Sequence, residues 1–308
     1  MLNLSSTLYG LTFALKAPLA KPQPEYPQHL LSFDQHQQIL ALLTEAGQLA
    51  LKAYQAYQQS PESLERRLKA DQTPVTEADL KVHELIVSRL AQITPHIVCV
   101  SEESEASVHH HRDHTAWLID PIDGTQQFID QTGEFSINLA LVHGKQARLG
   151  YIVFVVDQLI FLQNPEAPEQ LSVQHFSGSR EALIPKTCDQ LTFALSARSK
   201  KSDETHYTRW CQEHLSTKPN FKRAGSSFKF RMILEGRALA YPCPYPTSEW
   251  DTAAGQALIE AAGGKLLSVK GEPFKYLARS TLKNASFICL APGFDPKHAR
   301  ELISINPA

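Results

Sequence analysis

Hydrophobic residues recur along this chain with two different periods, and each period predicts one kind of element. Over residues 35–58, apolar side chains return every three or four positions, which indicates a long amphipathic helix. Short apolar runs bounded by turn residues are typical of strands. Strands are expected over residues 97–100, 117–119, 134–143, 147–156, 158–162, 191–195 and 238–241. Further helices are expected over residues 76–90, 124–128 and 203–216. Two more are expected to begin in the segments 224–229 and 245–251 and to end at about residues 235 and 262.

Two stretches without such a pattern divide the chain. The proline-rich start, residues 1–32, is expected to be a poorly ordered extension. Residues 165–185 are polar and poorly patterned, and the domain boundary is placed there. The sequence therefore predicts an N-terminal α+β part over residues 33–170 and a C-terminal α/β part over residues 185–308.

Composition narrows the classes of protein to consider. The chain has 308 residues, of which 43% are hydrophobic and 20% charged, as in a soluble globular protein with a sizeable core. A net charge of −2 gives no electrostatic argument for a nucleic-acid polymer as partner. The five cysteines are scattered without zinc-ligand spacing, which favours a reducing compartment over a disulfide framework. No apolar run reaches the length of a membrane span, so no integral membrane segment is expected.

Residues 117–125 carry the strongest chemical signal. A buried strand end is followed by a turn in which Asp120 and Asp123 flank a proline and Ile122. Mg²⁺ prefers oxygen ligands, and these two carboxylates and the Ile122 carbonyl could supply three of them. Gly124 and Thr125 then open a short helix, and free N–H groups at a helix start favour a phosphate. The alternative is an ordinary Asp/Pro/Gly turn, which is common.

Other acidic and histidine-rich segments allow a structural and a functional reading. Asp79 follows Thr76 by three residues, as in a capping box, or it presents a carboxylate to a water or a metal. Glu102 and Glu103 follow a short apolar strand, either in a solvated loop or at a strand end close to Asp120. The histidines of the run that follows sit among polar residues, and we expect a surface loop there: His109, His110, His111 and His114.

Two helix starts in the C-terminal part show the same ambiguity. Ser226, Ser227 and Lys229 lie in a small-residue loop whose amides, hydroxyls and ammonium suit an anion, although such a helix entry is also an ordinary cap. Asp251 stands in the first turn of a predicted helix, where a carboxylate suits the helix dipole. Neither feature identifies a site by itself.

Taken together, these segments resemble the inositol monophosphatase superfamily of Mg²⁺-dependent, lithium-sensitive phosphatases. That family is marked by W-x-x-D-P-x-D-G-T, which stands here at residues 117–125, and by W-D-x-A-A-G, at residues 250–255. Within it, the chain is most similar to the CysQ-type 3′(2′),5′-bisphosphate nucleotidases. Those enzymes remove the 3′-phosphate of adenosine 3′,5′-bisphosphate, a by-product of sulfate activation. The resemblance implies a layered sugar-phosphatase fold, with α+β and α/β parts in alternating layers of helix and sheet.

The same resemblance implies roles for individual residues. The metal ligands for two or three Mg²⁺ ions would be Glu102, Asp120, the Ile122 carbonyl, Asp123 and Asp251. Thr125, paired with Asp79, would orient and deprotonate the attacking water, and Glu103 would fix ligands or water. The residues expected at the substrate are Glu102, Ile122, Asp123, Gly124, Thr125, Lys200, Ser226, Ser227, Lys229 and Asp251. Lys200 stands where CysQ-type chains carry a histidine near the nucleotide, and Gln126-Gln127 replaces their Lys-Glu.

These implications lead to three ranked functions. The first is a phosphatase for adenosine 3′,5′-bisphosphate that also acts on its sulfated relative PAPS. The second is a phosphatase for inositol monophosphate or another small sugar phosphate, and the third is a catalytically silent metal-binding regulator. The expected partner is a small phosphate substrate, and the expected state is a monomer or homodimer. The expected location is the cytoplasm, with peripheral association at the inner membrane face as an alternative.

Overall fold

The computed structural model describes residues 30–63, 66–68, 74–104, 115–279, 281–294 and 302. Most of the expected N-terminal extension and the His109–His114 run lie outside these residues. Within the described part of the chain, no helix is both long and apolar enough to cross a membrane.

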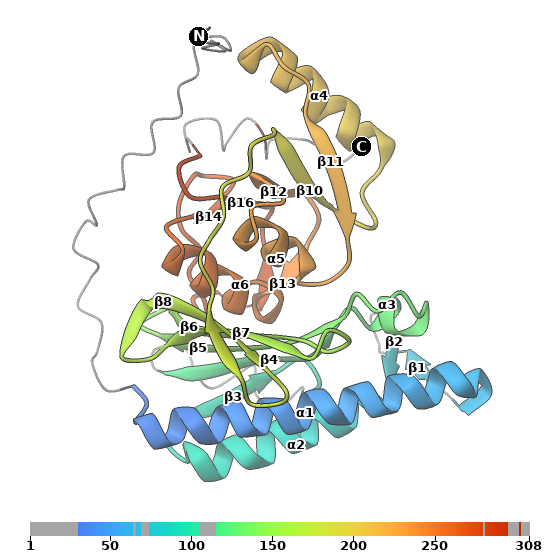
Figure 1. The fold of residues 1–308 in the computed structure, drawn as a ribbon, viewed down its shortest axis with the longest axis vertical. Coiled ribbons are helices and arrows are strands. Elements are labelled where there is room, and N and C mark those ends of the chain that lie inside the picture. Colours follow the sequence, from blue (N-terminus) through green and yellow to red (C-terminus); the bar gives the residue numbers. More distant parts are fainter. Residues whose placement is uncertain are drawn as a thin grey trace, which may run out of the picture.

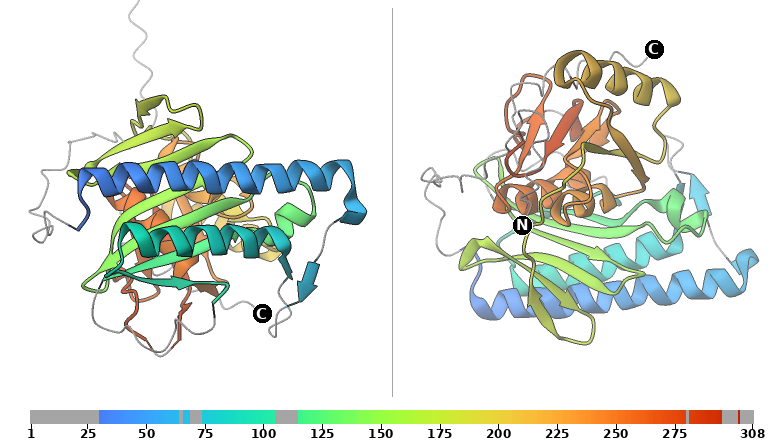
Figure 2. Two further views of the ribbon diagram at one scale, coloured as in Figure 1. Left: turned by 90° about the horizontal axis from the view of Figure 1, so that it is seen from below. Right: turned by 45° about the horizontal axis from the view of Figure 1, so that its top comes forward.

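Two long helices cover one face of the molecule, as the hydrophobic pattern predicts. They are α1 (Phe33–Gln59) and α2 (Glu77–Ile93). Ser32 begins α1 with a capping box, because its hydroxyl accepts the Gln35 N–H and Gln35 accepts the Ser32 N–H. Figures 1 and 2 show both helices lying against the same side of a large sheet. Their apolar sides pack there around the buried Trp117, whose indole N–H donates to Thr94 over 3.0 Å.

The large sheet has seven strands in sequence order. They are β3 (Val98–Ser101), β4 (Ala116–Asp123), β5 (Ser136–His143), β6 (Gln146–Phe154), β7 (Leu159–Asn164), β8 (Ala167–His175) and β9 (Arg180–Ala182). Only β3 and β4 pair in parallel, and the other neighbours are antiparallel. Residues 165–185, for which the sequence predicted no strand, contain β8 and β9. Their polar sequence suits the edge of the sheet, where one face stays in water.

The second sheet has five strands in a different order. It runs β11 (Asn220–Ala224), β10 (Thr192–Ser196), β12 (Ala240–Cys243), β16 (Phe287–Leu290) and β14 (Lys265–Ser268). Strand β10 is parallel to β11 and β12, whereas β16 runs antiparallel to β12 and β14. The change from the first sheet to the second falls between Ala182 and Thr192. The two-part division itself stays a prediction, with residues 167–182 joined to the first sheet.

Helices fill the space between the sheets and cover the second one. Between them lie α5 (Phe228–Leu234) and α6 (Glu249–Ala261), and α4 (Lys201–Leu215) covers the outer face (Figure 1). Helix α6 approaches β6 closely at Gly150, where a Cβ would lie only 2.4 Å from the Ala254 carbonyl oxygen. The result is the layered α/β fold that the family resemblance implies. The remaining short elements are η1 (Pro61–Ser63), β1 (Arg66–Leu68), β2 (Pro74–Thr76), α3 (Thr125–Ile129), β13 (Thr247–Ser248) and β15 (Lys283–Asn284).

Candidate active site

Glu102 and Asp120 reach the same point because their strands are parallel neighbours. Ser101, the last residue of β3, pairs with Ile119 of β4, so the next residue of each strand lies at the same place in the sheet. The Glu102 N–H donates to the Ile119 carbonyl over 3.0 Å, which continues this pairing. Two carboxylates are therefore presented side by side by the backbone itself.

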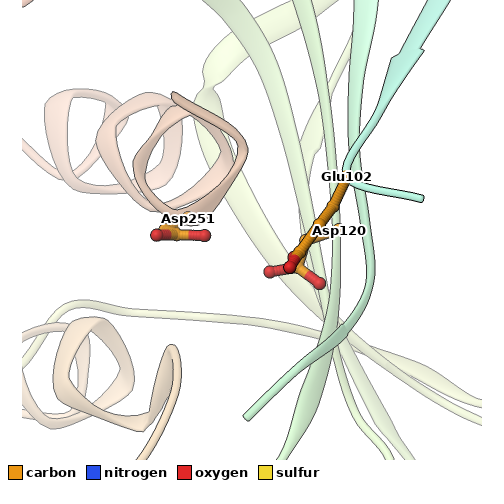
Figure 3. A group of neighbouring side chains, drawn as sticks. All are labelled: Glu102, Asp120 and Asp251. Carbon is orange, nitrogen blue, oxygen red and sulfur yellow. The ribbon is translucent and has the colours of Figure 1, made fainter. Parts of the chain in front are cut away.

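Asp251 approaches this pair from the other half of the molecule. It is the third residue of α6, and the Ser248 N–H donates to its Oδ2 over 2.6 Å in a capping box. Figure 3 shows its carboxylate facing Glu102 and Asp120, which converge from the sheet. One oxygen from each of the three residues lies within 4.8 Å of the others. The family resemblance implied that all three are metal ligands, and the structure brings them together.

The electrostatics of this cluster fit a hard cation. Asp120 is 2% exposed, and its Oδ1 has no hydrogen-bond partner among the described residues. Burial, followed by the charge of Glu102, raises the pKa of Asp120 well above its usual range. Burial and the charges of Asp123 and Glu102 also raise the pKa of Asp251, to about 8. Buried carboxylates that repel one another need a positive partner, and an all-oxygen set suits Mg²⁺.

Asp123 stands beside the cluster and is held more firmly. Its Oδ2 accepts from the Ser227 hydroxyl over 2.9 Å and the Asn138 amide over 3.1 Å, with the Ser136 hydroxyl at 3.4 Å. Burial raises its pKa, whereas the nearby Lys229 and these hydrogen bonds act in the opposite direction. The position of this carboxylate is therefore set by donors from both halves of the molecule.

Thr125 and Asp79 form the hydroxyl–carboxylate pair that the family resemblance implied. The Thr125 hydroxyl donates to Asp79 Oδ1 over 3.0 Å, while Asp79 Oδ2 accepts the Thr76 N–H over 2.8 Å. Asp79 is thus both half of a capping box and the partner of Thr125. Burial raises its pKa, although the bonds from Thr76 and Thr125 oppose this effect. A carboxylate with a raised pKa accepts a proton more readily.

Strand β4 runs through Asp123, with a register shift between Asp120 and Asp123, where the sequence led us to expect a turn directly after residue 119. The end of this strand and the residue after it position Ile122 and Gly124. The Ile122 side chain is buried, and its carbonyl lies 3.3 Å from the Thr125 hydroxyl. Gly124 precedes α3 with φ +95°, where a Cβ would lie 3.1 Å from Ser226 Cβ. Glu103 is half-buried in the turn after Glu102. The roles of Ile122 as a ligand and of Glu103 in fixing ligands or water stay predictions.

The loop after β11 is arranged differently from the expectation. We expected Ser227 and Lys229 to line the substrate side, but both are buried, at 1% and 6% exposure. The Ser227 hydroxyl is used by Asp123, and the Lys229 ammonium donates to the carbonyls of Ala224 and Ser226 beneath the loop. Ser226 remains partly exposed, with φ +35°. Lys200 is exposed before α4.

Three residues near the site were assigned no role from the sequence. Asn138 pairs with Asp120 across β4 and β5, so it shares a sheet face with a metal-ligand candidate, and a polar residue in a buried strand was the available signal. Glu134 accepts the Gly225 N–H over 2.7 Å and so joins the two halves. Lys283 donates to Ser248 at the start of α6, and no local pattern indicated it.

Fold and site together define an α/β protein that can hold hard cations beside a hydroxyl–carboxylate pair, an arrangement suited to metal-assisted hydrolysis. The chain belongs to the inositol monophosphatase family, whose model matches residues 34–304. This match includes residues 165–185, where the sequence analysis placed the domain boundary.

Individual relatives carry a more specific name. The chain is 33% identical to the 3′(2′),5′-bisphosphate nucleotidase CysQ of Salmonella typhimurium over 82% of its length and 97% of that protein. It is 32% identical to the CysQ of Escherichia coli K12, over 81% of the chain and 97% of that protein. The crystal structure of CysQ from Bacteroides thetaiotaomicron has a TM-score of 0.70 at 29% identity, covering 84% of this chain and 98% of that one.

Proposed function

We propose that the chain is a 3′(2′),5′-bisphosphate nucleotidase that uses Mg²⁺ to remove the 3′-phosphate of adenosine 3′,5′-bisphosphate. The products are AMP and phosphate, and PAPS is a second substrate. The observation that carries the chemistry is the cluster of Glu102, Asp120 and Asp251, whose oxygens lie within 4.8 Å of one another beside Thr125 and Asp79. The choice of nucleotide rests on relatives that are more than 30% identical over most of their length and are named for this activity.

The metal ions would be held by the carboxylate cluster, Asp123 and the Ile122 carbonyl, in a set of two or three. When bound, Mg²⁺ lowers the pKa of water and neutralises charge on the transferring phosphoryl group. Two observations support this assignment: Asp120 Oδ1 has no hydrogen-bond partner among the described residues, and burial with the charges of Asp123 and Glu102 raises the pKa of Asp251 to about 8. The Gly124 and Thr125 amides, at the start of α3, would contact the phosphoryl oxygens.

Thr125 and Asp79 supply the proton transfer. The Thr125 hydroxyl gives its proton to Asp79 Oδ1 along the existing 3.0 Å hydrogen bond, and its oxygen takes a proton from the attacking water. The water oxygen forms a bond to phosphorus as the bond from phosphorus to the 3′ oxygen breaks. The 3′ oxygen leaves with the electron pair of that bond and takes a proton from a second water molecule, whose hydroxide takes up the proton held by Asp79. Asp79 suits the role of acceptor because burial raises its pKa.

The nucleoside would lie between the loops that follow β10 and β11. These strands are parallel neighbours, and they end together at Ser196 and Ala224. The loop after β10 leads to α4 on the outer face, whereas the loop after β11 leads to α5 between the sheets (Figure 1). Open α/β sheets bind ligands at the point where neighbouring connections diverge in this way. Lys200, before α4, and Ser226, in the loop after β11, would flank the nucleoside. The buried Ser227 and Lys229 would hold the second loop in place through their hydrogen bonds.

Phosphate release distinguishes the competing functions. Adenosine 3′,5′-bisphosphate, inositol 1-phosphate and fructose 1,6-bisphosphate are compared in Mg²⁺, with and without lithium, and Asp123→Asn is the control variant. A preference for the nucleotide that is lost in the variant supports the proposal. A preference for inositol or sugar phosphate would keep the mechanism but replace the substrate. No release from any of them would point to the silent metal-binding alternative.

Three finer properties belong to the same proposal. Lithium is expected to inhibit release, and the enzyme is placed in the cytoplasm or peripherally at the inner membrane face, as a monomer or homodimer. Inhibition in the assay above, fractionation of cells and sedimentation of the purified chain test these three points in turn.

A further inference from the structure

Lys283 contacts the first turn of α6, although it is far in the sequence from the other residues near the site. It belongs to β15, which pairs antiparallel with β13 through Ser248↔Lys283. Its Nζ donates to the Ser248 hydroxyl over 3.1 Å, and its side chain is exposed. The ammonium therefore stands on the N-cap residue of the helix that carries Asp251.

The backbone that carries Lys283 is fixed in this place by its neighbour. Asn284 is buried, and its amide group donates to the Ser248 carbonyl over 2.6 Å and to the Thr252 hydroxyl over 2.9 Å. Both acceptors belong to the beginning of α6. Lys283 is thus held against the first turn of that helix by a buried hydrogen-bond network.

Lys283 and Asp251 are linked through one residue. The Ser248 N–H donates to Asp251 Oδ2 over 2.6 Å, and the Ser248 hydroxyl accepts from Lys283. Burial and the charges of Asp123 and Glu102 disfavour the ionised form of Asp251, and the charge of Lys283 opposes them. The buried Lys229 also interacts with Asp251. A positive charge in this position stabilises an ionised Asp251 and repels a second cation.

We propose that Lys283 is a positioning residue that acts as a tethered cation for Asp251 and weakens the binding of the Mg²⁺ ion that shares this carboxylate. The proposal rests on the metal assignment in the proposed function. Without metal, Lys283 offsets the repulsion among the carboxylates. With metal, the same charge opposes the ion, so one Mg²⁺ position is held less tightly and exchanges more readily.

Loss of the Lys283 charge is expected to destabilise the metal-free protein but to strengthen Mg²⁺ binding. This combination distinguishes the proposed role from a merely structural one. Removing the charge lowers the melting temperature in EDTA, because the carboxylates lose a counter-charge. It also tightens Mg²⁺ binding and enlarges the rise in melting temperature that Mg²⁺ produces. A lysine that only ties β15 to α6 would lower the melting temperature in both conditions and would leave Mg²⁺ affinity unchanged or weaker.

The test is calorimetric titration with Mg²⁺ at low ionic strength, together with melting in EDTA and in Mg²⁺. The variants are Lys283→Met, Lys283→Arg and the control Lys265→Met. Lys265 is an exposed lysine that follows the other end of α6, a helix of 13 residues and thus about 20 Å long. We expect Lys283→Met to bind Mg²⁺ about threefold to tenfold more tightly, and the other two variants to match the unaltered chain.

The outcomes distinguish a failure of the role proposed for Lys283 from a failure of the metal assignment. Unchanged or weaker Mg²⁺ binding by Lys283→Met, when the unaltered chain binds Mg²⁺, would overturn the role of Lys283 and leave the proposed function standing. Equal tightening in Lys265→Met would also overturn it, because a general charge effect would then be sufficient. No Mg²⁺ binding by the unaltered chain would overturn both the metal assignment and this inference.

Discussion

Thr125 and Asp79 are joined by a hydrogen bond of 3.0 Å, although one begins the short helix α3 and the other lies in the first turn of α2. The two oxygens of Asp79 serve different purposes, because Oδ1 accepts from Thr125 and Oδ2 accepts from the Thr76 N–H. The capping box thus holds the carboxylate still while its other oxygen faces the site. Asp79 therefore combines its structural role in the capping box with the catalytic role that we propose for it.

Two substitutions of Thr125 distinguish the effect of its hydroxyl on activity from the effect of its side-chain shape. Thr125→Val keeps a β-branched side chain but removes the hydroxyl, and we expect kcat to fall by roughly 10²- to 10⁴-fold, the usual range for lost proton transfer. Thr125→Ser keeps the hydroxyl and should retain most of the activity. Steady-state phosphate release measures both, and calorimetry should show Mg²⁺ binding in each. Turnover of Thr125→Val equal to that of the unaltered chain would remove Thr125 from the mechanism.

Asn138 is predicted to hold Asp123 in a position where it can bind metal. Its amide donates to Asp123 Oδ2 over 3.1 Å inside the protein, at 1% exposure. Asn138→Ala should lower the free energy of unfolding by about 1–3 kcal/mol, since a buried carboxylate loses a donor. Mg²⁺ affinity should fall by roughly 10- to 100-fold, as for other residues that orient metal ligands. Denaturant unfolding and calorimetry measure these effects.

A matched control for this prediction is Asn164→Ala. Asn164 ends β7 and accepts the Glu166 N–H in an exposed turn, so its loss should leave Mg²⁺ affinity unchanged. If both variants bound Mg²⁺ like the unaltered chain, Asp123 would not depend on Asn138 for its position.

The metal-free protein should lose stability as the pH rises. Burial, with the charges of Asp123 and Glu102, raises the pKa of Asp251 from 3.8 to about 8. The folded chain therefore keeps a proton that the unfolded chain releases, and this contribution to stability is complete below about pH 4 and lost by about pH 8. Asp120 acts in the same direction. His36 changes the stability only at lower pH, because burial lowers the pKa of His36 from 6.5 to about 4.

Melting temperatures between pH 6.5 and 8 isolate this effect from that of His36. In EDTA the melting temperature should fall across this window, and saturating Mg²⁺ should flatten the slope because the ion replaces the proton. Asp251→Asn should flatten it without metal. A metal-free protein that becomes more stable as the pH rises through this window would contradict the assignment of these carboxylates.

Capping boxes and strand patterns are local features of the sequence, and they account for the part of the site that could be predicted without the family resemblance. Asp79 and Asp251 are third residues of helices, after Thr76 and Ser248, and such capping boxes can be recognised within four residues of sequence. Asp120 lies in the buried strand β4, where a carboxylate has little reason to stand without a partner. The meeting of Asp120 with Asp251 is not local, and it became predictable only through the family resemblance.

Tertiary packing explains what the sequence did not predict. Strand β8 is polar because it lies near an edge of the sheet, so hydrophobic periodicity could not indicate it. The burial of Lys229 depends on carbonyls of its own loop folding over the ammonium. Lys283 reaches the site only through the pairing of β15 with β13. None of these contacts leaves a periodic or short-range pattern in the sequence.

Glu134 is predicted to order the loop after β11, which we propose to contact the nucleoside. Its Oε2 accepts the Gly225 N–H over 2.7 Å, and this bond ties the connection between α3 and β5 to the loop after β11. Bonds to a charged acceptor are worth about 1.5–3 kcal/mol. Glu134→Ala should therefore raise KM for adenosine 3′,5′-bisphosphate by about tenfold, with a smaller effect on kcat. Glu134→Gln keeps an acceptor oxygen and should lose less.

Two further measurements make this prediction specific to the loop. Hydrogen exchange at the amides of residues 225–227 should become faster in Glu134→Ala, whereas the exposed-residue control Glu169→Ala, on β8, should change neither exchange nor KM. Faster exchange with an unchanged KM would show that loop order does not limit nucleotide binding. An unchanged exchange rate would mean that the hydrogen bonds of Ser227 to Asp123 and Asn138 hold the loop without Glu134, because those bonds also join the two halves.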